Sequence, residues 1–240
     1  MRPQGSDTLN TFTIVLIPGL LCDGWIWRHQ AAALAARAPV HVPVLYEPPT
    51  LTAMAQRILD ETAGPLAVAG HSMGGRVAFE MARLAPKRIV RLAGLDTGHD
   101  AAKPEERPKR MALVDRARRE GMAAMAGEWL PPMMHPDRVD DAPLMEALTA
   151  MVSRATPDIF ARQQNALLTR PDAAPHLRNV TCPTSFVCGR QDRWSPLAQH
   201  EAMQAMVRSS TLTAIEDAGH MSPVEQPDAV TAALVRWLEQ

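Results

Sequence analysis

One short segment constrains the fold of this chain more than any other, residues 66–82, which read LAVAGHSMGGRVAFEMA. The apolar run from Leu66 to Ala69 is typical of a buried strand, and a helical pattern begins at Gly74. Ser72 stands between the two in a Gly-x-Ser-x-Gly arrangement. A chain that passes from strand to helix so abruptly strains the residue at the turn, and glycine suits the crowded neighbouring positions. The segment therefore predicts a serine hydroxyl presented at the carboxyl end of a strand.

Short apolar runs alternate with longer helical patterns along the rest of the chain. The sequence predicts strands over residues 11–18, 40–45, 66–70, 88–96, 184–189 and 210–216. Helices are predicted over residues 24–37, 51–62, 74–85, 197–207 and 228–239. Pro43 marks the second strand as an edge strand, because proline cannot donate to a ladder of hydrogen bonds. The alternation predicts an α/β fold, with a mostly parallel, twisted sheet of about six strands and helices on both faces.

Residues 97–178 interrupt this alternation, since they are rich in proline and contain no good strand pattern. Helical patterns there cover residues 110–129, 144–154 and 158–169. We predict three parts in the chain: residues 1–96 and 179–240 form one core, and residues 97–178 form a helical lid inserted after the fourth strand. The methionines of the insertion are open to two interpretations, as a flexible lining for acyl chains or as the buried faces of lid helices.

A serine hydroxyl becomes a strong nucleophile only when a base accepts its proton and a third group orients the base. His220 follows the last predicted strand in the segment AGHMSPVEQP, and Asp192 follows the fifth in GRQDRWSP. The order serine, aspartate, histidine is typical of a catalytic triad built on such a turn. We therefore predict Ser72 as the nucleophile, His220 as the base and Asp192 as the acid. Asp96, at the end of the fourth predicted strand, remains an alternative acid.

Four segments together, LIPGLLCDGWIW, GHSMGG, GRQDRWSP and AGHMSPVEQP, resemble the α/β-hydrolase superfamily in its compact bacterial esterase-like branch. The resemblance covers residues 12–93 and 183–240. It implies an oxyanion hole formed by the backbone N–H groups of Leu20 and Met73. The family often has His-Gly-x before this hole, whereas residues 18–20 read Pro-Gly-Leu here. The family also has two earlier strands, so we expect a trimmed sheet edge.

The resemblance implies a serine hydrolase that cleaves a carboxylic ester of a small or medium apolar acyl group through an acyl-enzyme. Candidate substrate contacts are Leu21, Met125, Trp129, Met133, Trp194 and Met221. The same triad serves thioesterases, lactonases, C–C bond hydrolases, perhydrolases and slow-turnover small-molecule receptors, which all remain alternatives. The segment GGRVAFEMA, with Arg76 in it, resembles the pyruvate-expelling lyases of menaquinone synthesis. The competing interpretation is that Arg76 is a solvated residue of the helix.

The composition restricts the other function classes. The net charge of −1 gives no basic footprint for nucleic acid. We expect no metal and no cofactor, because neither metal-ligand spacing nor a phosphate-binding glycine loop is present. The first ten residues lack the apolar core of a signal peptide, and no apolar run is long enough to span a bilayer.

We therefore expect a cytoplasmic monomer or homodimer that acts on a small-molecule acyl substrate. Its odd number of cysteines, Cys22, Cys182 and Cys188, predicts free thiols in a reducing compartment. His71, next to the predicted nucleophile, is predicted to serve in packing. Five other histidines are predicted at the surface or in loops: His29, His41, His135, His176 and His200.

Overall fold

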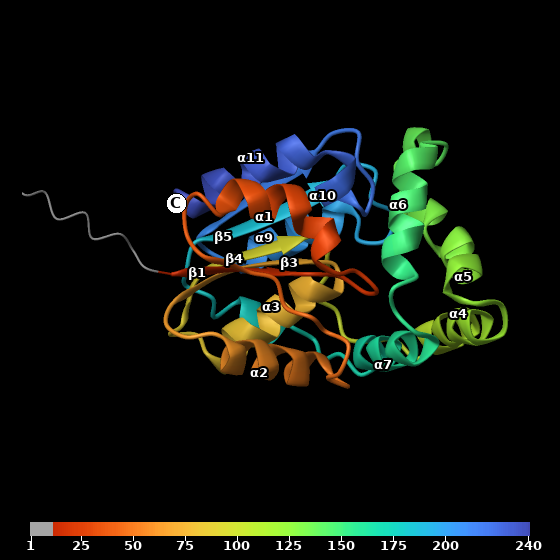
Figure 1. Cartoon of the computed structure of the whole chain (residues 1–240). Coiled ribbons are helices and arrows are strands. Elements are labelled where there is room, and N and C mark those ends of the chain that lie inside the picture. The colour runs from red at the N-terminus through yellow and green to blue at the C-terminus, as the bar shows by residue number, and fades with distance from the viewer. Residues whose placement is uncertain (1–11) are drawn as a thin grey trace, which may run out of the picture.

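The computed structural model describes residues 12–240, so the amino-terminal segment in which no signal peptide is predicted lies outside the described residues. Six parallel strands form one sheet in the order β2-β1-β3-β4-β5-β6 (Figure 1). Their bounds are β1 Thr13–Ile17, β2 Val40–His41, β3 Leu66–His71, β4 Ile89–Leu95, β5 Thr184–Gly189 and β6 Ser210–Ile215. The predicted α/β class and parallel sheet are confirmed, and the carboxyl ends of the strands lie along one edge.

The strands follow from the apolar runs of the sequence. All six residues of β3 and of β5 are buried, as expected of strands covered on both faces. The second strand is much shorter than predicted, since only Val40 and His41 pair with β1. Pro43 comes two residues after His41 and cannot donate to the ladder, which agrees with the edge position of β2.

Helices cover both faces of the sheet: α1 and α11 lie on one face, and α2 and α3 lie on the other (Figure 1). Outside the segment between β4 and β5, the helices are α1 Arg28–Leu34, α2 Leu51–Glu61, α3 Met73–Leu84, α9 Leu197–Met206, α10 Ser222–Glu225 and α11 Pro227–Leu238. A 3₁₀ turn, Gly24–Trp27, forms the first part of the helix predicted over residues 24–37. The short helix α10 was not predicted.

The segment between β4 and β5 is helical, as its sequence predicts. It contains α4 Glu106–Glu120, α5 Met122–Trp129, α6 Ala142–Val152, α7 Pro157–Leu168 and α8 Ala174–Leu177. The single helix predicted over residues 110–129 is two helices, because Gly121 adopts a φ of 89° between α4 and α5. Helices α4 to α7 stand together at one end of the molecule, beside the carboxyl ends of the strands (Figure 1). Within residues 12–240, every helix is too short or too polar to cross a membrane.

Candidate active site

The turn between β3 and α3 holds Ser72 in an unusual backbone conformation. Its φ of 53° and ψ of −116° lie in a region that residues other than glycine rarely adopt, and such a conformation typically costs about 1–3 kcal/mol. Neighbouring backbone leaves no room for side chains here. A Cβ at Gly70 would collide with the carbonyl of Gly74, and a Cβ at Gly74 would collide with the carbonyl of Ile17. The two glycines therefore allow the sharp turn that the sequence predicts, and the turn directs the serine hydroxyl into a cavity.

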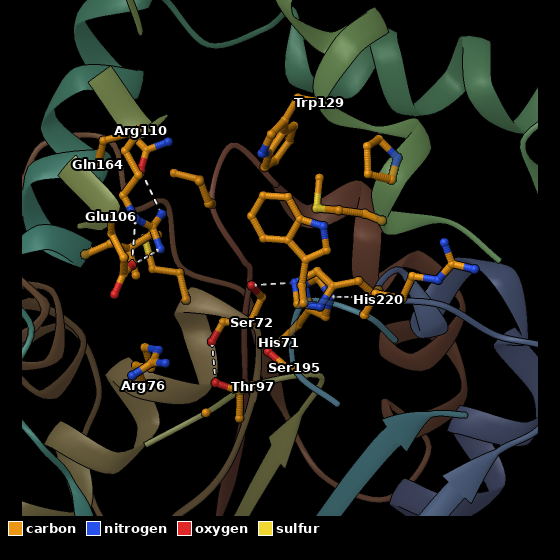
Figure 2. Close-up of a pocket in the computed structure, with 18 of the residues that line it drawn as sticks. His71, Ser72, Arg76, Thr97, Glu106, Arg110, Trp129, Gln164, Ser195 and His220 are labelled. Carbon is orange, nitrogen blue, oxygen red and sulfur yellow. Dashed lines mark hydrogen bonds and ion pairs between the residues drawn. The ribbon is translucent and has the colours of Figure 1, made fainter. Parts of the chain in front are cut away.

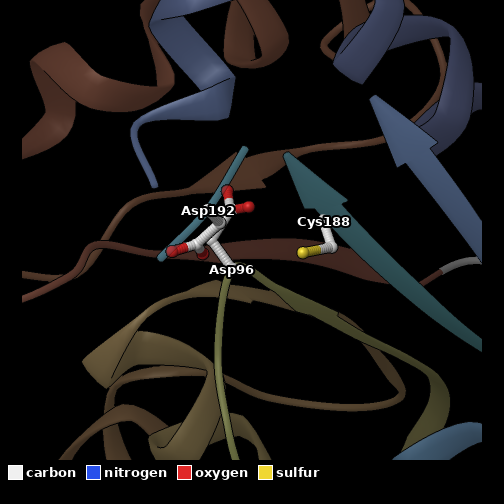
Figure 3. A group of neighbouring side chains, drawn as sticks. All are labelled: Asp96, Cys188 and Asp192. Atoms are coloured by element: carbon white, nitrogen blue, oxygen red, sulfur yellow. The ribbon is translucent and has the colours of Figure 1, made fainter. Parts of the chain in front are cut away.

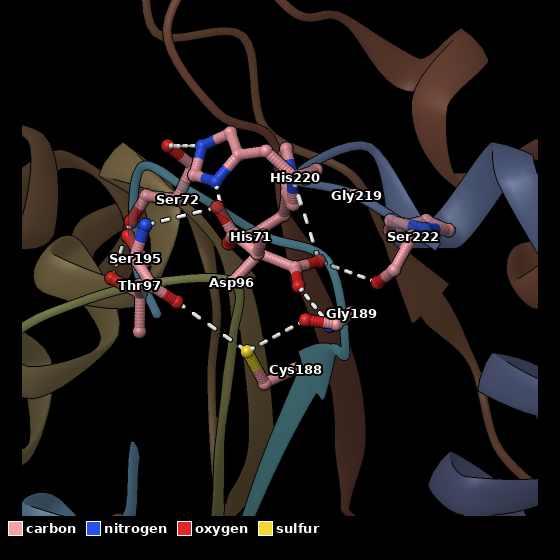
Figure 4. Close-up of polar contacts among 12 residues, drawn as sticks. His71, Ser72, Asp96, Thr97, Cys188, Gly189, Ser195, Gly219, His220 and Ser222 are labelled. Carbon is pink, nitrogen blue, oxygen red and sulfur yellow. Dashed lines mark hydrogen bonds and ion pairs between the residues drawn. The ribbon is translucent and has the colours of Figure 1, made fainter. Parts of the chain in front are cut away.

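Three side chains from the ends of three strands form a continuous hydrogen-bonded chain (Figure 4). His220, in the loop after β6, has its Nε2 atom 2.8 Å from the Oγ atom of Ser72. Its Nδ1 atom lies 2.8 Å from Oδ2 of Asp192, which follows β5. The other carboxylate oxygen of Asp192 accepts the N–H groups of Trp194 and Ser195 at 2.8 and 2.9 Å. The structure thus brings together all three residues of the predicted triad.

The electrostatics of this chain suit proton transfer. Burial lowers the pKa of His220, but the Asp192 carboxylate outweighs burial, and the net shift is upward from the usual 6.5. Burial raises the pKa of Asp192, but the charge and hydrogen bond of His220 outweigh it and lower the pKa overall. The pair therefore favours an ionised Asp192 carboxylate and makes the His220 ring a stronger base than a free imidazole.

A second layer of polar groups lies beneath these residues (Figure 4). Burial lowers the pKa of His71 to about 3, so its ring is neutral. Its Nε2 atom lies 2.7 Å from the carbonyl oxygen of His220, and because a carbonyl only accepts, this nitrogen carries the proton. His71 therefore holds the His220 backbone in place, which goes beyond the packing role that was predicted.

His200 was predicted at the surface or in a loop, and this prediction is wrong. The residue lies in α9 and is completely buried, and its Nε2 atom accepts the N–H of Thr97 at 3.0 Å. Burial lowers its pKa to about 4, so the ring stays neutral. The hydroxyl of Thr97 in turn donates to the Ser72 carbonyl at 2.7 Å. A buried histidine on α9 thus supports the loop that contacts the strained turn.

Asp96, the alternative acid, points to other partners. Its Oδ1 atom accepts the N–H of Gly189 at 2.8 Å, and its Oδ2 atom is hydrogen-bonded to the hydroxyl of Ser222. Burial and the nearby charge of Asp192 raise the pKa of Asp96 well above its usual value. The geometry therefore favours Asp192 over Asp96 as the partner of the His220 ring.

Asp96 and Asp192 also lie close to Cys188, with potential ligand atoms of all three within 4.8 Å of one another (Figure 3). This grouping is poorly suited to a metal ion. The carboxylate oxygens already accept hydrogen bonds, and the thiol donates to the carbonyls of Gly189 and Ser195. Burial raises the pKa of Cys188, which opposes the thiolate form that metals require. All three cysteines of the chain are free.

The two residues expected as oxyanion donors lie in the loop after β1 and at the start of α3. Leu20 and Met73 both line the cavity beside Ser72. Neither backbone N–H has a protein acceptor among the hydrogen bonds of residues 12–240. The next N–H in the loop, that of Leu21, is occupied by Oε1 of Gln163 at 2.9 Å. Gln163, on α7, therefore fixes the loop, and no sequence pattern indicates this contact.

The cavity around Ser72 has a volume of about 740 Å³ and two chemically different sides (Figure 2). Trp129 and His220 lie on one side, and the Trp194 ring is 6.3 Å from that of His220. Met133 and Met221 also line the cavity, and the Met133 carbonyl accepts the His220 N–H. Four predicted substrate contacts therefore do border the cavity. Charged residues of α3 and α4 lie on the opposite side of Ser72.

Two predicted substrate contacts do not reach the cavity. Leu21 is fully buried in the core, and its φ of 59° belongs to the turn that Gln163 holds. Met125 is fully buried where α5 packs against α4 and α6. Both residues serve in packing, so for Met125 the second interpretation of the insertion methionines holds.

The charged side of the cavity was missed in the sequence. Glu106 on α4 pairs with Arg110 at 2.8 Å and with Arg170, which lies after α7. Arg110 also donates to Oε1 of Gln164 at 2.9 Å. These arginines lower the pKa of Glu106 to about 2, against the opposing effect of burial. The only available signal was the i, i+4 spacing of Glu106 and Arg110, which is common on solvated helices.

Comparisons with known proteins agree with this fold. A family model described as "Alpha/beta hydrolase family" matches residues 14–233. A pimeloyl-[acyl-carrier protein] methyl ester esterase of Aliivibrio salmonicida is 25% identical, over 98% of this chain and 93% of that protein. A thermophilic esterase from Thermogutta terrifontis superimposes with a TM-score of 0.84 at 30% identity, covering 95% of this chain and 89% of the other. An enol-lactonase from Burkholderia xenovorans LB400 gives a TM-score of 0.85 at 24% identity, covering 96% and 92%.

Proposed function

Because the chain belongs to the alpha/beta hydrolase family, we propose that it is a serine hydrolase that cleaves carboxylic esters. The observation that carries this proposal is the hydrogen-bonded chain from Ser72 through His220 to Asp192, with both contacts at 2.8 Å. The unused N–H groups of Leu20 and Met73 support it, because such donors stabilise the negative charge of an ester's transition state. A small-molecule acyl ester fits the cavity of about 740 Å³.

The first half of the proposed reaction forms an acyl-enzyme. The Oγ atom of Ser72 bonds to the ester carbonyl carbon while its proton passes to Nε2 of His220. The carbonyl oxygen becomes an oxyanion and accepts hydrogen bonds from the N–H groups of Leu20 and Met73. The bond to the alkoxy oxygen then breaks, and His220 gives its proton to the leaving alcohol. Asp192 stabilises the imidazolium and fixes its tautomer throughout.

The second half releases the acid. Water attacks the acyl carbon while His220 accepts one of its protons, and the bond between the acyl carbon and Ser72 breaks as His220 returns that proton to the serine. We propose that residues 97–178 act as a lid over this site and select the substrate. Their contribution of Trp129, Met133 and the charged residues of α4 to the cavity lining supports this role.

The test is steady-state hydrolysis of p-nitrophenyl esters of increasing acyl length. We expect Ser72→Ala to lower kcat by about 10⁴-fold or more, because the nucleophile is lost. Ser153→Ala removes the same hydroxyl from an exposed position on the insertion and should leave the rate unchanged. Sustained turnover at the wild-type rate by folded Ser72→Ala would refute the assignment. A single burst of about one equivalent by the wild-type protein would instead identify a slow-turnover receptor.

A further inference from the structure

Arg76 lies inside the cavity, and the proposed reaction does not use it. It is the fourth residue of α3, and its backbone N–H donates to the carbonyl of Ser72 at 3.4 Å. Figure 2 shows Arg76 on the same side of Ser72 as Glu106 and Arg110, away from His220. Its Nη1 atom donates to the carbonyl of Asp100 at 2.8 Å. Among residues 12–240, no carboxylate lies within ion-pair distance of its guanidinium.

The charges around Arg76 do not balance. Glu106 is shared between Arg110 and Arg170, so three guanidiniums lie near two carboxylates, those of Glu106 and Asp100. The Asp100 side chain is 45% exposed and instead contacts Gln199 at 3.3 Å and His99 at 3.4 Å. Burial and the charge of Arg170 lower the pKa of Arg76 to about 9, so the group is still a cation at neutral pH. A partly buried cation without a paired carboxylate is costly, and an anionic ligand would reduce that cost.

The position of His220 determines which part of an ester would meet Arg76. The leaving alcohol takes its proton from Nε2 of His220, so its oxygen must lie on the His220 side of Ser72. That side carries Trp129 and Trp194, which suit an apolar alcohol. The acyl chain then extends from the carbonyl carbon toward the opposite side, where Arg76 lies.

We propose that the acyl group of the natural ester ends in a carboxylate, which pairs with the guanidinium of Arg76. The substrate class is therefore a monoester of a short dicarboxylic acid with an apolar alcohol. This inference rests on the proposed ester hydrolysis, and it replaces the expected wholly apolar acyl group with an apolar chain that has an anionic end. A planar guanidinium can bind a carboxylate through two parallel hydrogen bonds, which gives orientation as well as affinity.

The test compares two esters that differ only in charge, monomethyl adipate and its neutral monoamide, methyl 6-amino-6-oxohexanoate. Methanol release gives kcat/KM for each. We expect the wild-type enzyme to prefer the carboxylate by about tenfold or more, because tenfold corresponds to about 1.4 kcal/mol, which a single hydrogen bond between charged groups can supply. Arg76→Gln should reduce that ratio to about one, mainly through KM, while turnover of the amide remains. Arg208→Gln removes an equal charge from an exposed position outside the cavity lining and should keep the preference.

The outcomes separate this inference from the proposed function. Ser72-dependent turnover of both esters without a preference, or a preference that survives in Arg76→Gln, overturns the inference alone and makes Arg76 a support for the Asp100 loop. If Arg76→Gln does not fold, Arg76→Lys, which keeps the charge but not the planar fork, should show a reduced preference, and an undiminished one overturns the proposal. If the wild-type protein hydrolyses no ester, ester hydrolysis is refuted. In that case calorimetry of adipate binding tests the anion site. The proposal that Arg76 binds a carboxylate is overturned if the wild-type protein does not bind adipate, or if Arg76→Lys binds it equally well.

Discussion

The two buried aspartates at the site allow a matched test of which carboxylate orients His220. In Asp192→Asn, two backbone N–H groups, from Trp194 and Ser195, continue to require an acceptor where Oδ1 stood. The new amide must therefore place its NH₂ group where Oδ2 met Nδ1 of His220, at 2.8 Å. Nδ1 can then only accept, so the proton moves to Nε2 and faces Ser72. The imidazole is held in the tautomer that cannot accept the serine proton.

A comparable change of tautomer in serine proteases costs about 10⁴-fold in kcat, or about 5 kcal/mol. We expect a loss of that size for Asp192→Asn. In Asp96→Asn, by contrast, the amide oxygen can accept the Gly189 N–H and the NH₂ group can donate to the Ser222 hydroxyl. Both hydrogen bonds survive between neutral groups, so the rate should change by no more than about threefold.

The assay is kcat with a p-nitrophenyl ester at pH 8, together with thermal unfolding of both variants. Unfolding temperatures close to the wild-type value would show that any loss of rate is a loss of chemistry. Equal losses in the two variants, or a larger loss in Asp96→Asn, would refute the tautomer argument and restore Asp96 as the acid.

Two further predictions concern pH and backbone packing. His220 must be neutral to act as the base, and its pKa is raised above 6.5. We therefore expect kcat/KM to fall about tenfold per pH unit below a midpoint that lies above pH 6.5. A pH profile with a midpoint below about 6 would contradict this. Gly74→Ala places a methyl group against the Ile17 carbonyl and should destabilise the fold by about 3 kcal/mol or more, whereas Gly127→Ala on α5 meets nothing within 4 Å and should stabilise it by about 0.5–1 kcal/mol. Thermal unfolding measures both, and similar unfolding temperatures for the two variants would show that the turn tolerates a side chain.

Much of the fold was predictable because its signals are local. An apolar run followed by glycine lies in each of β3 and β5, Leu66–Ala69 in the first and Phe186–Cys188 in the second, and the predicted and observed ends of both strands differ by at most one residue. The errors were also local. Pro43 shortened β2, and Gly121 divided one predicted helix into α4 and α5. The proline and the glycine were both visible in the sequence, but whether such a residue ends a strand or a helix depends on the packing around it.

The arrangement of the site was predictable for a related reason. In a parallel sheet the carboxyl ends of the strands share one edge, so residues placed just after β3, β5 and β6 must lie near one another. No such rule places the residues that support the site from other elements. Gln163 reaches the Leu21 N–H across 142 positions of sequence, and His200 reaches Thr97 across 103. Such contacts depend on how α7 and α9 pack, which a hydrophobic pattern does not specify.

Substrate preference belongs to this less predictable part of the molecule. Arg76 on its own is one arginine of a helix, and sequence alone cannot distinguish it from a solvated residue. It acquires a distinct environment only because Glu106, which comes from the insertion, is already shared by two other arginines. The proposed reaction and the proposed preference thus depend on different residues and are tested by different measurements. The midpoint of the pH profile reports on His220, whereas the ratio of rates for charged and neutral esters reports on Arg76, so each can be altered while the other serves as its control.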